Sequence, residues 1–346
     1  MPTASSFGNK DRYYAAKKLP APDSEGFLSF SRVNAEVRQA FLARHQFLHE
    51  NVQRTVTSWS NQLRELIRSE TGLKFSSGNE RHSVSVHVVD GLPLPLASAF
   101  EEISDPLLWE IVLNNATLKT TLTGLDVVIK NFEALGEWRE QNPSPITLDE
   151  LHNTRQLVAN LIKWLESQSI RQRFQSIDED VLGAYFFRKG NIQIYWMAIY
   201  LVARILDVSV AGLTIAVLAH ELVHAYTHVG SDIDGEQWET NAFAEAELKI
   251  VEGLAQFYTA IICKKLEGKL PGLSNAFEQL LSIQSPTYTA FRSWSTVNER
   301  AGEIVRFSMI GARKKKLGSY KGFLEEMKKV RERVGRGIPD PEASAG

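Results

Sequence analysis

Three histidines and a glutamate lie close together in the stretch LAHELVHAYTHVG, residues 218–230. His220 and His224 are four residues apart, so on an α-helix they project from the same face, one turn apart. Two imidazoles placed in this way can bind one Zn²⁺ ion at ~2.0–2.1 Å each. Glu221 projects about 100° away from His220. It can therefore stand beside the ion without binding it, where a general base for a metal-activated water belongs.

The alternative interpretation is a core helix whose two histidines are only hydrogen-bonded. The residues that precede His220, VAGLTIAVLA, are small and uncharged, so the helix is expected to be buried where its histidines and Glu221 begin. A buried charged group must be paired or bound to a metal. The sequence therefore favours a metal site.

A catalytic zinc site takes three protein ligands and leaves one position for water. His228 lies roughly 12 Å farther along the helix than His220, too far to bind the same ion. Glu252 is the strongest candidate, because it is a lone carboxylate in the apolar segment LKIVEGLAQFYTAII and Gly253 next to it lets another helix approach. Glu252 at the polar edge of an amphipathic helix remains the alternative. The rival ligands lie in a polar loop whose side chains are expected to be solvated: Asp232, Asp234 and Glu236.

The motif from His220 to His224, followed downstream by VEGLA at 251–255, resembles the zincin metallopeptidases of the gluzincin type. The resemblance covers roughly residues 147–265 and implies one Zn²⁺ per chain, bound by His220, His224 and Glu252. It also implies that Glu221 accepts a proton from the water that attacks a peptide carbonyl and then passes it to the leaving amine. In that family, a sheet-edge strand before the active helix pairs with an extended substrate.

The match departs from other zincins in two ways. A metzincin would need Gly at 227 and His at 230, where this chain has Thr227 and Gly230. The downstream histidine with which some gluzincins stabilise the oxyanion is also absent. We expect Tyr288 to take that role as a further catalytic residue, with Arg292 as the other candidate, although core or surface roles for both are not excluded by the sequence.

The segments that position these residues alternate between helix and a few strands. Apolar residues at helical spacing predict one long helix, or two nearly collinear ones, over about 33–71. The alternating run SVSVHVVDG (83–91) predicts a strand, GLPLPL a loop, and 96–139 helical structure. After the break at 141–146, Thr147 and Glu150 form a capping box for a helix through Leu151, Leu157, Leu161 and Leu165.

The rest of the chain should carry the site. Two β-rich runs flank Arg188–Asn191 and predict a hairpin, whose strands at 184–187 and 192–195 are the candidates to hold a substrate backbone. A helix over about 197–206 is followed by a second that begins at Asp207 or Ser209 and carries the histidines. Another helix, from about 242 to 266, carries Glu252.

The expected fold is mainly α with a small β-sheet (α+β), with a zincin-like catalytic core between N-terminal and C-terminal helical regions. We divide the chain into a flexible tail (1–30), an N-terminal mostly helical region (31–145), the metal-binding core (146–268), a C-terminal helical region (269–335) and a second tail (336–346).

Composition narrows the compartment and the partners. Hydrophobic residues make up 43% of the 346 residues, the net charge is −2, and a single cysteine excludes an internal disulfide. The first residues lack an apolar signal segment, and the apolar runs 192–203 and 208–219 are shorter than the ~20 residues of a spanning helix. We therefore expect a cytoplasmic protein with a peptide or protein substrate and no membrane partner. The oligomeric state does not follow from the sequence.

The alternative function depends on the basic C-terminal region. Residues 300–336 hold twelve Lys or Arg and four Asp or Glu, a net charge of 12 − 4 = +8, densest in RKKK at 313–316. Such a face can bind nucleic acid or an acidic partner around a non-catalytic metal. The absence of interleaved aromatics or a reading motif does not favour nucleic acid, and a structural site does not need Glu221. An intracellular protease that cuts one specific partner is a third interpretation, which the sequence does not separate from a general peptidase.

Overall fold

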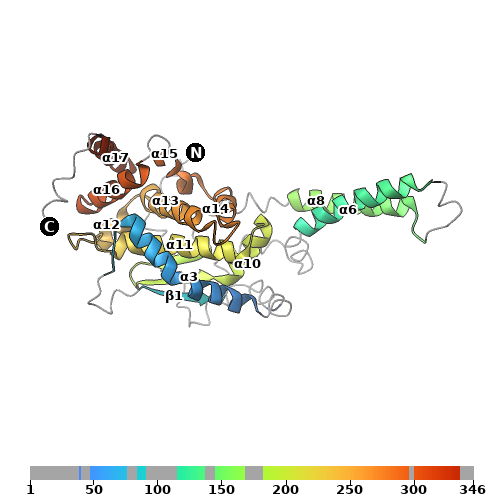
Figure 1. The fold of residues 1–346 in the computed structure, drawn as a ribbon, viewed down its shortest axis with the longest axis horizontal. Coiled ribbons are helices and arrows are strands. Elements are labelled where there is room, and N and C mark those ends of the chain that lie inside the picture. The colour runs from blue at the N-terminus through green and yellow to red at the C-terminus, as the bar shows by residue number, and fades with distance from the viewer. Residues whose placement is uncertain are drawn as a thin grey trace, which may run out of the picture.

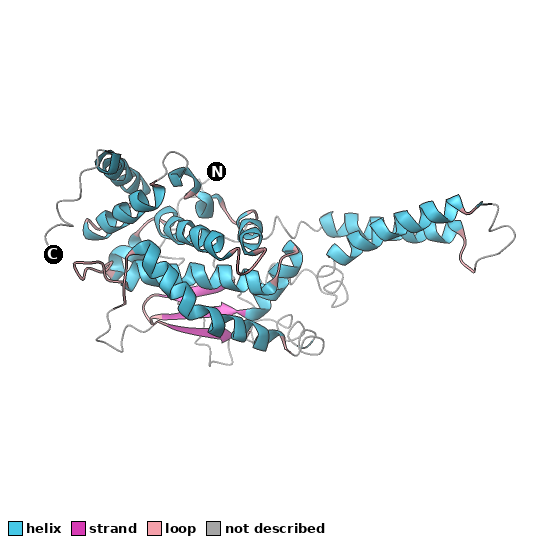
Figure 2. Ribbon diagram, viewed as in Figure 1, coloured by secondary structure: helices cyan, strands magenta, loops and turns pink. Residues whose placement is uncertain are grey.

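The computed structural model describes residues 39, 47–75, 84–90, 115–136, 145–167, 182–295 and 300–335. In these residues the protein is mainly helical with one small sheet, as the sequence predicts (Figures 1 and 2). The two predicted tails, the GLPLPL loop and the predicted helical stretch 96–114 lie outside the described residues.

The sheet has three strands in the order β1-β3-β2. β2 (Gly183–Phe186) and β3 (Asn191–Tyr195) are antiparallel, and β1 (Ser85–Val89) pairs in parallel with β3. The hairpin and the first strand are confirmed. The turn between β2 and β3 places Gly190 at φ 65°, a left-handed conformation that glycine adopts without strain. β3 is therefore central, and β2 is an edge strand among the described strands.

The body of the protein is built around α11 (Val210–Val229), which is buried along nearly its whole length. It packs against α3 (Leu48–Thr71), α13 (Leu248–Leu266) and α14 (Leu273–Leu281), and it lies over β2 and β3 (Figure 1). The helix begins after Ser209, whose Oγ accepts a hydrogen bond of 2.8 Å from the Gly212 amide. The preceding helix, α10 (Trp196–Leu206), ends at Asp207 in a left-handed conformation.

α11 is, among the described helices, the one that is long and apolar enough to cross a membrane by length and composition. The helix continues beyond the apolar run 208–219 through the histidine motif, so it has 20 residues. Most of its apolar window, 89%, is buried within the protein, as in the core helix of a globular fold.

The predicted single helix over 242–266 is wrong at its start, because the chain breaks it into α12 (Thr240–Glu245) and α13. Ala246 and Glu247 are extended between the two helices. The Glu247 amide donates a hydrogen bond of 2.8 Å to the carbonyl of Gly318, a residue far away in the sequence. This tertiary contact replaces a helical hydrogen bond. The sequence has no glycine or proline at this position from which the break could be predicted.

The C-terminal part is helical and covers α13. It contains a short 3₁₀ turn, η2 (Pro286–Thr289), then α15 (Arg292–Ser295), α16 (Ala301–Lys314) and α17 (Tyr320–Gly335), with α16 packed on α17.

Two further helices, α6 (Asn115–Ala134) and α8 (Leu148–Ser167), pack on each other and project from the body as an arm (Figure 1). The predicted capping box at the start of α8 is confirmed. The Thr147 amide donates to Glu150 Oε2 at 2.8 Å, and the Glu150 amide donates to Thr147 Oγ1 at 3.2 Å.

Candidate metal centre

His220, His224 and Glu252 meet in the core of the protein, where α11 packs against α13. Glu252 Oε2 lies 3.2 Å from His220 Nε2 and 3.3 Å from His224 Nε2, and the two Nε2 atoms are 3.0 Å apart. Among the described residues, this is the one group of three or more metal-ligating side chains close enough to share an ion. These three residues, which we call the metal centre, can hold a metal ion.

The spacing of the three ligand atoms suits a small tetrahedral ion. Ligands bound tetrahedrally at ~2.0–2.1 Å are about 3.3–3.4 Å apart, and the observed separations are 3.0–3.3 Å. His220, His224 and Glu252 would therefore supply three protein ligands to one ion, the number that a catalytic zinc site takes. Without a cation, the triangle needs shared protons to avoid repulsion between the lone pairs of two imidazoles and a carboxylate.

Burial makes a charge on any of these three side chains energetically costly, and the neighbouring groups change the pKa values of His220 and Glu252. His220, His224 and Glu252 expose only 7%, 4% and 3% of their surface. Burial lowers the pKa of His220, the nearby charge of His224 lowers it further, and Glu252 partly opposes both. Burial alone would raise the pKa of Glu252, but the charge of His224 and the hydrogen bonds to both imidazoles lower it below its usual value. The carboxylate of Glu252 is therefore ionised, and both imidazoles must be neutral before the three groups can bind a cation.

Glu221 follows the first histidine on α11 and is also buried, with 2% of its surface exposed. Its side chain lies against β2, at Gly183. A Cβ atom at position 183 would come within 3.0 Å of Glu221 Cγ and 3.2 Å of its Oε1. The edge strand therefore passes directly alongside the predicted base.

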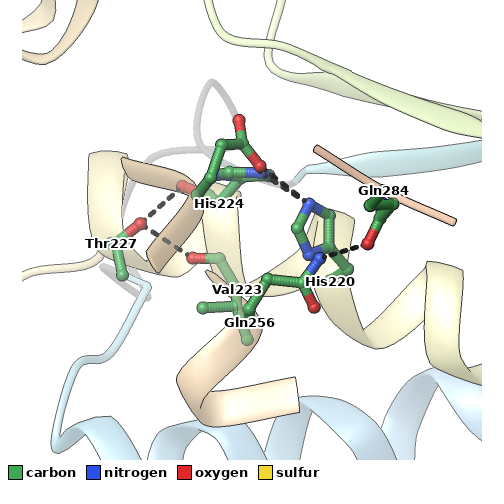
Figure 3. A network of polar contacts seen from close by, with 7 residues as sticks. His220, Val223, His224, Thr227, Gln256 and Gln284 are labelled. Carbon is green, nitrogen blue, oxygen red and sulfur yellow. Dashed lines mark hydrogen bonds and ion pairs between the residues drawn. The ribbon is translucent and has the colours of Figure 1, made fainter. Parts of the chain in front are cut away.

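The backbone of α11 is braced at the second histidine. The Thr227 hydroxyl donates to the carbonyls of Val223 at 2.9 Å and of His224 at 3.1 Å (Figure 3). Figure 3 also shows Gln256, one turn after Glu252 on α13, donating to Gln284 Oε1 at 3.2 Å. Gln256 is buried and was missed by sequence reasoning, although a polar residue four positions after Glu252 in an apolar helix was an available signal.

Tyr288 lies beside the metal centre. It is buried in η2, and its ring centroid is 6.4 Å from that of His220. Arg292, the other candidate, has a side chain that is half exposed and forms an ion pair with Glu278. The structure therefore places Tyr288, of these two, next to a metal-binding side chain.

Gly253 explains how α13 fits into the core directly after Glu252. A Cβ atom on Gly253 would come within 2.4 Å of the Trp294 indole. The indole nitrogen donates to the Tyr320 hydroxyl at 3.1 Å, so α15, α17 and α13 meet at this point. The predicted close approach at Gly253 is confirmed, and the partner is the Trp294 ring.

His228 takes no part in the metal centre. Its Nδ1 lies 3.0 Å from the Tyr185 hydroxyl and its Nε2 lies 3.2 Å from Thr240 Oγ1. The ring stacks on Phe243 with a centroid distance of 4.6 Å. Burial, helped by the charge of Arg313, lowers the pKa of His228 to about 4. This histidine is a neutral core residue that ties β2 to α12.

The three rival acidic residues are likewise outside the metal centre. Asp232 Oδ1 accepts hydrogen bonds from the amides of Asp234 at 3.0 Å and Glu236 at 2.9 Å, which closes a turn. The Asp234 carboxylate pairs with Lys314 at 2.6 Å. Neither carboxylate belongs to the group that can hold a metal.

The densest part of the basic C-terminal region is engaged within the protein. Arg313 is buried on α16 and donates to the carbonyls of Gly230 and Glu236, and burial lowers its pKa to about 10. Lys315 pairs with buried Glu326 at 2.8 Å. Three of the four basic side chains of RKKK, those of Arg313, Lys314 and Lys315, therefore make contacts within the protein.

A scan of family models and searches of curated proteins and of solved structures found no match to this chain.

Proposed function

We propose that the protein is a zinc-dependent metallopeptidase whose metal is bound by His220, His224 and Glu252. The observation that carries the proposal is the convergence of three buried ligand atoms within 3.0–3.3 Å of one another, with a fourth buried group, Glu221, next to them in the sequence.

Zinc suits this ligand set better than Mg²⁺ or Ca²⁺ does. Two imidazoles and one carboxylate are the ligands of many catalytic zinc sites, whereas Mg²⁺ and Ca²⁺ prefer sets made of oxygen atoms only. A bound zinc would supply a Lewis acid that lowers the pKa of water toward neutrality and polarises a carbonyl group.

Glu221 would act as the general base. It stands on the same turn as His220 but is not one of the three converging ligands. In this position its carboxylate can accept a proton from a water molecule and deliver it to the leaving amine. Its burial against β2 holds the side chain in one place and excludes bulk water. Tyr288, beside His220, is the proposed donor that stabilises the developing oxyanion.

An extended peptide is the proposed substrate, and β2 is the strand that would hold it. Of the two predicted strands, β3 lies between β1 and β2, so both of its edges are already paired. β2 pairs with β3 on one side and carries Gly183 next to Glu221. A peptide added to this edge would bring a carbonyl group close to the base.

The test begins with protein purified without added metal. About one zinc per chain is expected, together with hydrolysis of an unfolded protein substrate such as casein that a chelator abolishes and zinc restores. Glu221→Gln should keep the zinc and lose turnover, because it removes the base but no ligand. His224→Ala should lose both. Full hydrolysis by the Glu221→Gln protein would contradict the assignment of Glu221 as the general base. Full activity of zinc-free protein would contradict the whole proposal.

A further inference from the structure

The arm formed by α6 and α8 exposes much of the apolar surface in the described part of the protein. Nine large hydrophobic side chains are exposed in that part, and six of them lie on or beside the arm. They are Val127, Val128, Leu135, Ile146, Leu157 and Trp164. Leu157 exposes 69% of its surface. An arm of two helices that only had to be soluble would carry charged residues at these positions.

Charges are present on the arm, but they gather on one side of it. On α6, Asp126 and Glu133 project to the same side as Lys119 and Lys130, at about 60–120° from the stripe that packs on α8. On α8, Arg155 pairs with Asp126, and His152 lies 3.8 Å from Glu133. These cross-helix pairs show that the charged sides of the two helices coincide.

Among the described side chains of the arm, the opposite side carries no charged group other than Glu150, whose carboxylate accepts hydrogen bonds from Thr147 in the helix cap. We call this side the uncharged face. Helical spacing places seven residues on it: Thr121, Gly124 and Val128 from α6, Leu135 from the turn directly after α6, and Thr154, Leu157 and Leu161 from α8.

The two threonines of the uncharged face use their hydroxyl groups in hydrogen bonds within their own helices. The hydroxyls of Thr121 and Thr154 donate to the backbone carbonyls of Thr117 and Glu150, each at 2.8 Å, so their methyl groups are left to point outward. Gly124 has open space where a side chain would be, and it allows another helix to approach closely. A helix surface that combines apolar groups, small residues and no charge has the composition of the centre of an interface.

We propose that the uncharged face pairs with the same face of a second copy of this chain, so that two arms form a four-helix bundle. A face without charge can oppose itself across a two-fold axis without repulsion between like charges. A charged partner would find nothing complementary on this face, because the charges of the arm lie on its other side. The proposal is independent of the metal centre.

The size and position of the arm suit this pairing. Helices of 20 residues are about 30 Å long, so two of them side by side offer about 600 Å² per copy, or about 1,200 Å² in total, the lower limit of a stable interface. The arm projects from the body, so two arms can pack along their length with the bodies apart (Figure 1).

The test compares neighbouring positions on one helix. Full-length protein and its variants are analysed by sedimentation equilibrium over a wide range of concentrations. Val128→Glu and Leu157→Glu each place a carboxylate on the uncharged face and should weaken dimerisation ~100-fold or more. Val127→Glu is the matched control, because Val127 is more exposed than Val128 (55% against 47%) but projects about 100° away.

A dimer in the unmodified protein and in Val127→Glu, with monomers in Val128→Glu and Leu157→Glu, supports the proposal. Far-UV circular dichroism verifies that the helices of each variant remain folded. A chain that stays monomeric at tens of micromolar overturns it, since another partner or another segment must then cover the face. Equal loss of dimer in Val127→Glu and Val128→Glu also overturns it, because the effect would then not belong to this face.

Discussion

Gly183 on β2 and Glu221 on α11 are packed so closely that no side chain fits between them. The Cβ of an alanine at 183 would approach Val217 Cγ1 to 2.9 Å and Glu221 Cγ to 3.0 Å. Real Cβ atoms are not found this close to their neighbours, so the strand, the helix or the Glu221 side chain has to move. The absence of a side chain at 183 thus fixes the distance between the sheet edge and the proposed base.

Gly183→Ala should therefore impair catalysis while it leaves metal binding intact. A displacement of Glu221 by about 1 Å can lower kcat/KM by about 100-fold. The zinc content should stay at the level of the unmodified protein, because His220, His224 and Glu252 are not touched by position 183. Gly268→Ala is the control, since a methyl group there meets nothing within 4 Å. An unchanged kcat/KM in Gly183→Ala would contradict the proposed role of Glu221 in the reaction.

Removal of one ligand charge should weaken metal binding without disturbing the shape of the core. Glu252→Gln keeps the size of the side chain but replaces the ionised carboxylate that faces both imidazoles. We expect the affinity for zinc to fall by more than about 100-fold. Mutation of residues that only hydrogen-bond to a metal ligand already lowers metal affinity about 10- to 100-fold. Competition with a chromogenic chelator measures the affinity. Glu278→Gln, at an exposed carboxylate, is the control and should bind zinc normally.

Gly253→Ala should destabilise the fold, because its methyl group would come within 2.4 Å of the Trp294 ring. Overpacking of this kind costs about 1–3 kcal/mol in the free energy of unfolding. Urea denaturation measures the loss, with Gly302→Ala as the control, where the added methyl group meets open space. The smaller side chain at 294 in the double variant Gly253→Ala/Trp294→Leu should restore part of the stability lost in Gly253→Ala. An additive loss in the double variant would contradict the contact.

His228 should make the stability of the protein depend on pH in mildly acidic solution. Its pKa is about 4 in the folded protein, against about 6.5 for an ordinary histidine. The unfolded chain therefore binds the additional proton between pH 6.5 and 4, so the contribution of His228 is complete above pH 6.5 and is lost as the pH falls toward 4. The loss amounts to about 3 kcal/mol at most.

The measurement compares urea unfolding of the chelator-treated protein and of His228→Gln at pH 7.0, 5.5 and 4.5. Groups other than His228 titrate in both proteins, so the difference between the two isolates this residue. The stability difference between them should change over this window. An identical pH dependence in both proteins would mean that His228 is not held neutral by its surroundings.

The metal centre could be anticipated from the sequence because its geometry is mostly local. Two histidines four positions apart on a helix share one face whatever surrounds them, and a lone glutamate in an apolar helix requires a partner. The distance between Glu252 and the two imidazoles is not local. It depends on the packing of α11 against α13, two helices that are far apart in the sequence.

Other features depend on contacts between distant residues and carry no local signal. Glu247 leaves the helix because its amide bonds to the Gly318 carbonyl, and Gly183 faces Glu221 because β2 crosses α11. The leucines from 151 to 165 predict a helix, which the structure confirms as α8, but Leu157 is exposed. Helical periodicity shows that a helix has an apolar side but not whether a second helix of the same chain covers that side.

The metal centre joins α11 and α13, and the chain between His224 and Glu252 is 252 − 224 = 28 residues long. An ion held at both ends of that segment would act as a cross-link, comparable to a disulfide that closes a loop of similar length. The chain has a single, buried cysteine and cannot form an internal disulfide, so a bound ion would restrain the chain in a way that requires no oxidation. Arg313 already fastens the beginning of this segment to α16, and the Glu247 amide fastens its end to Gly318, so the ion would add a third restraint to a segment that is held at two points.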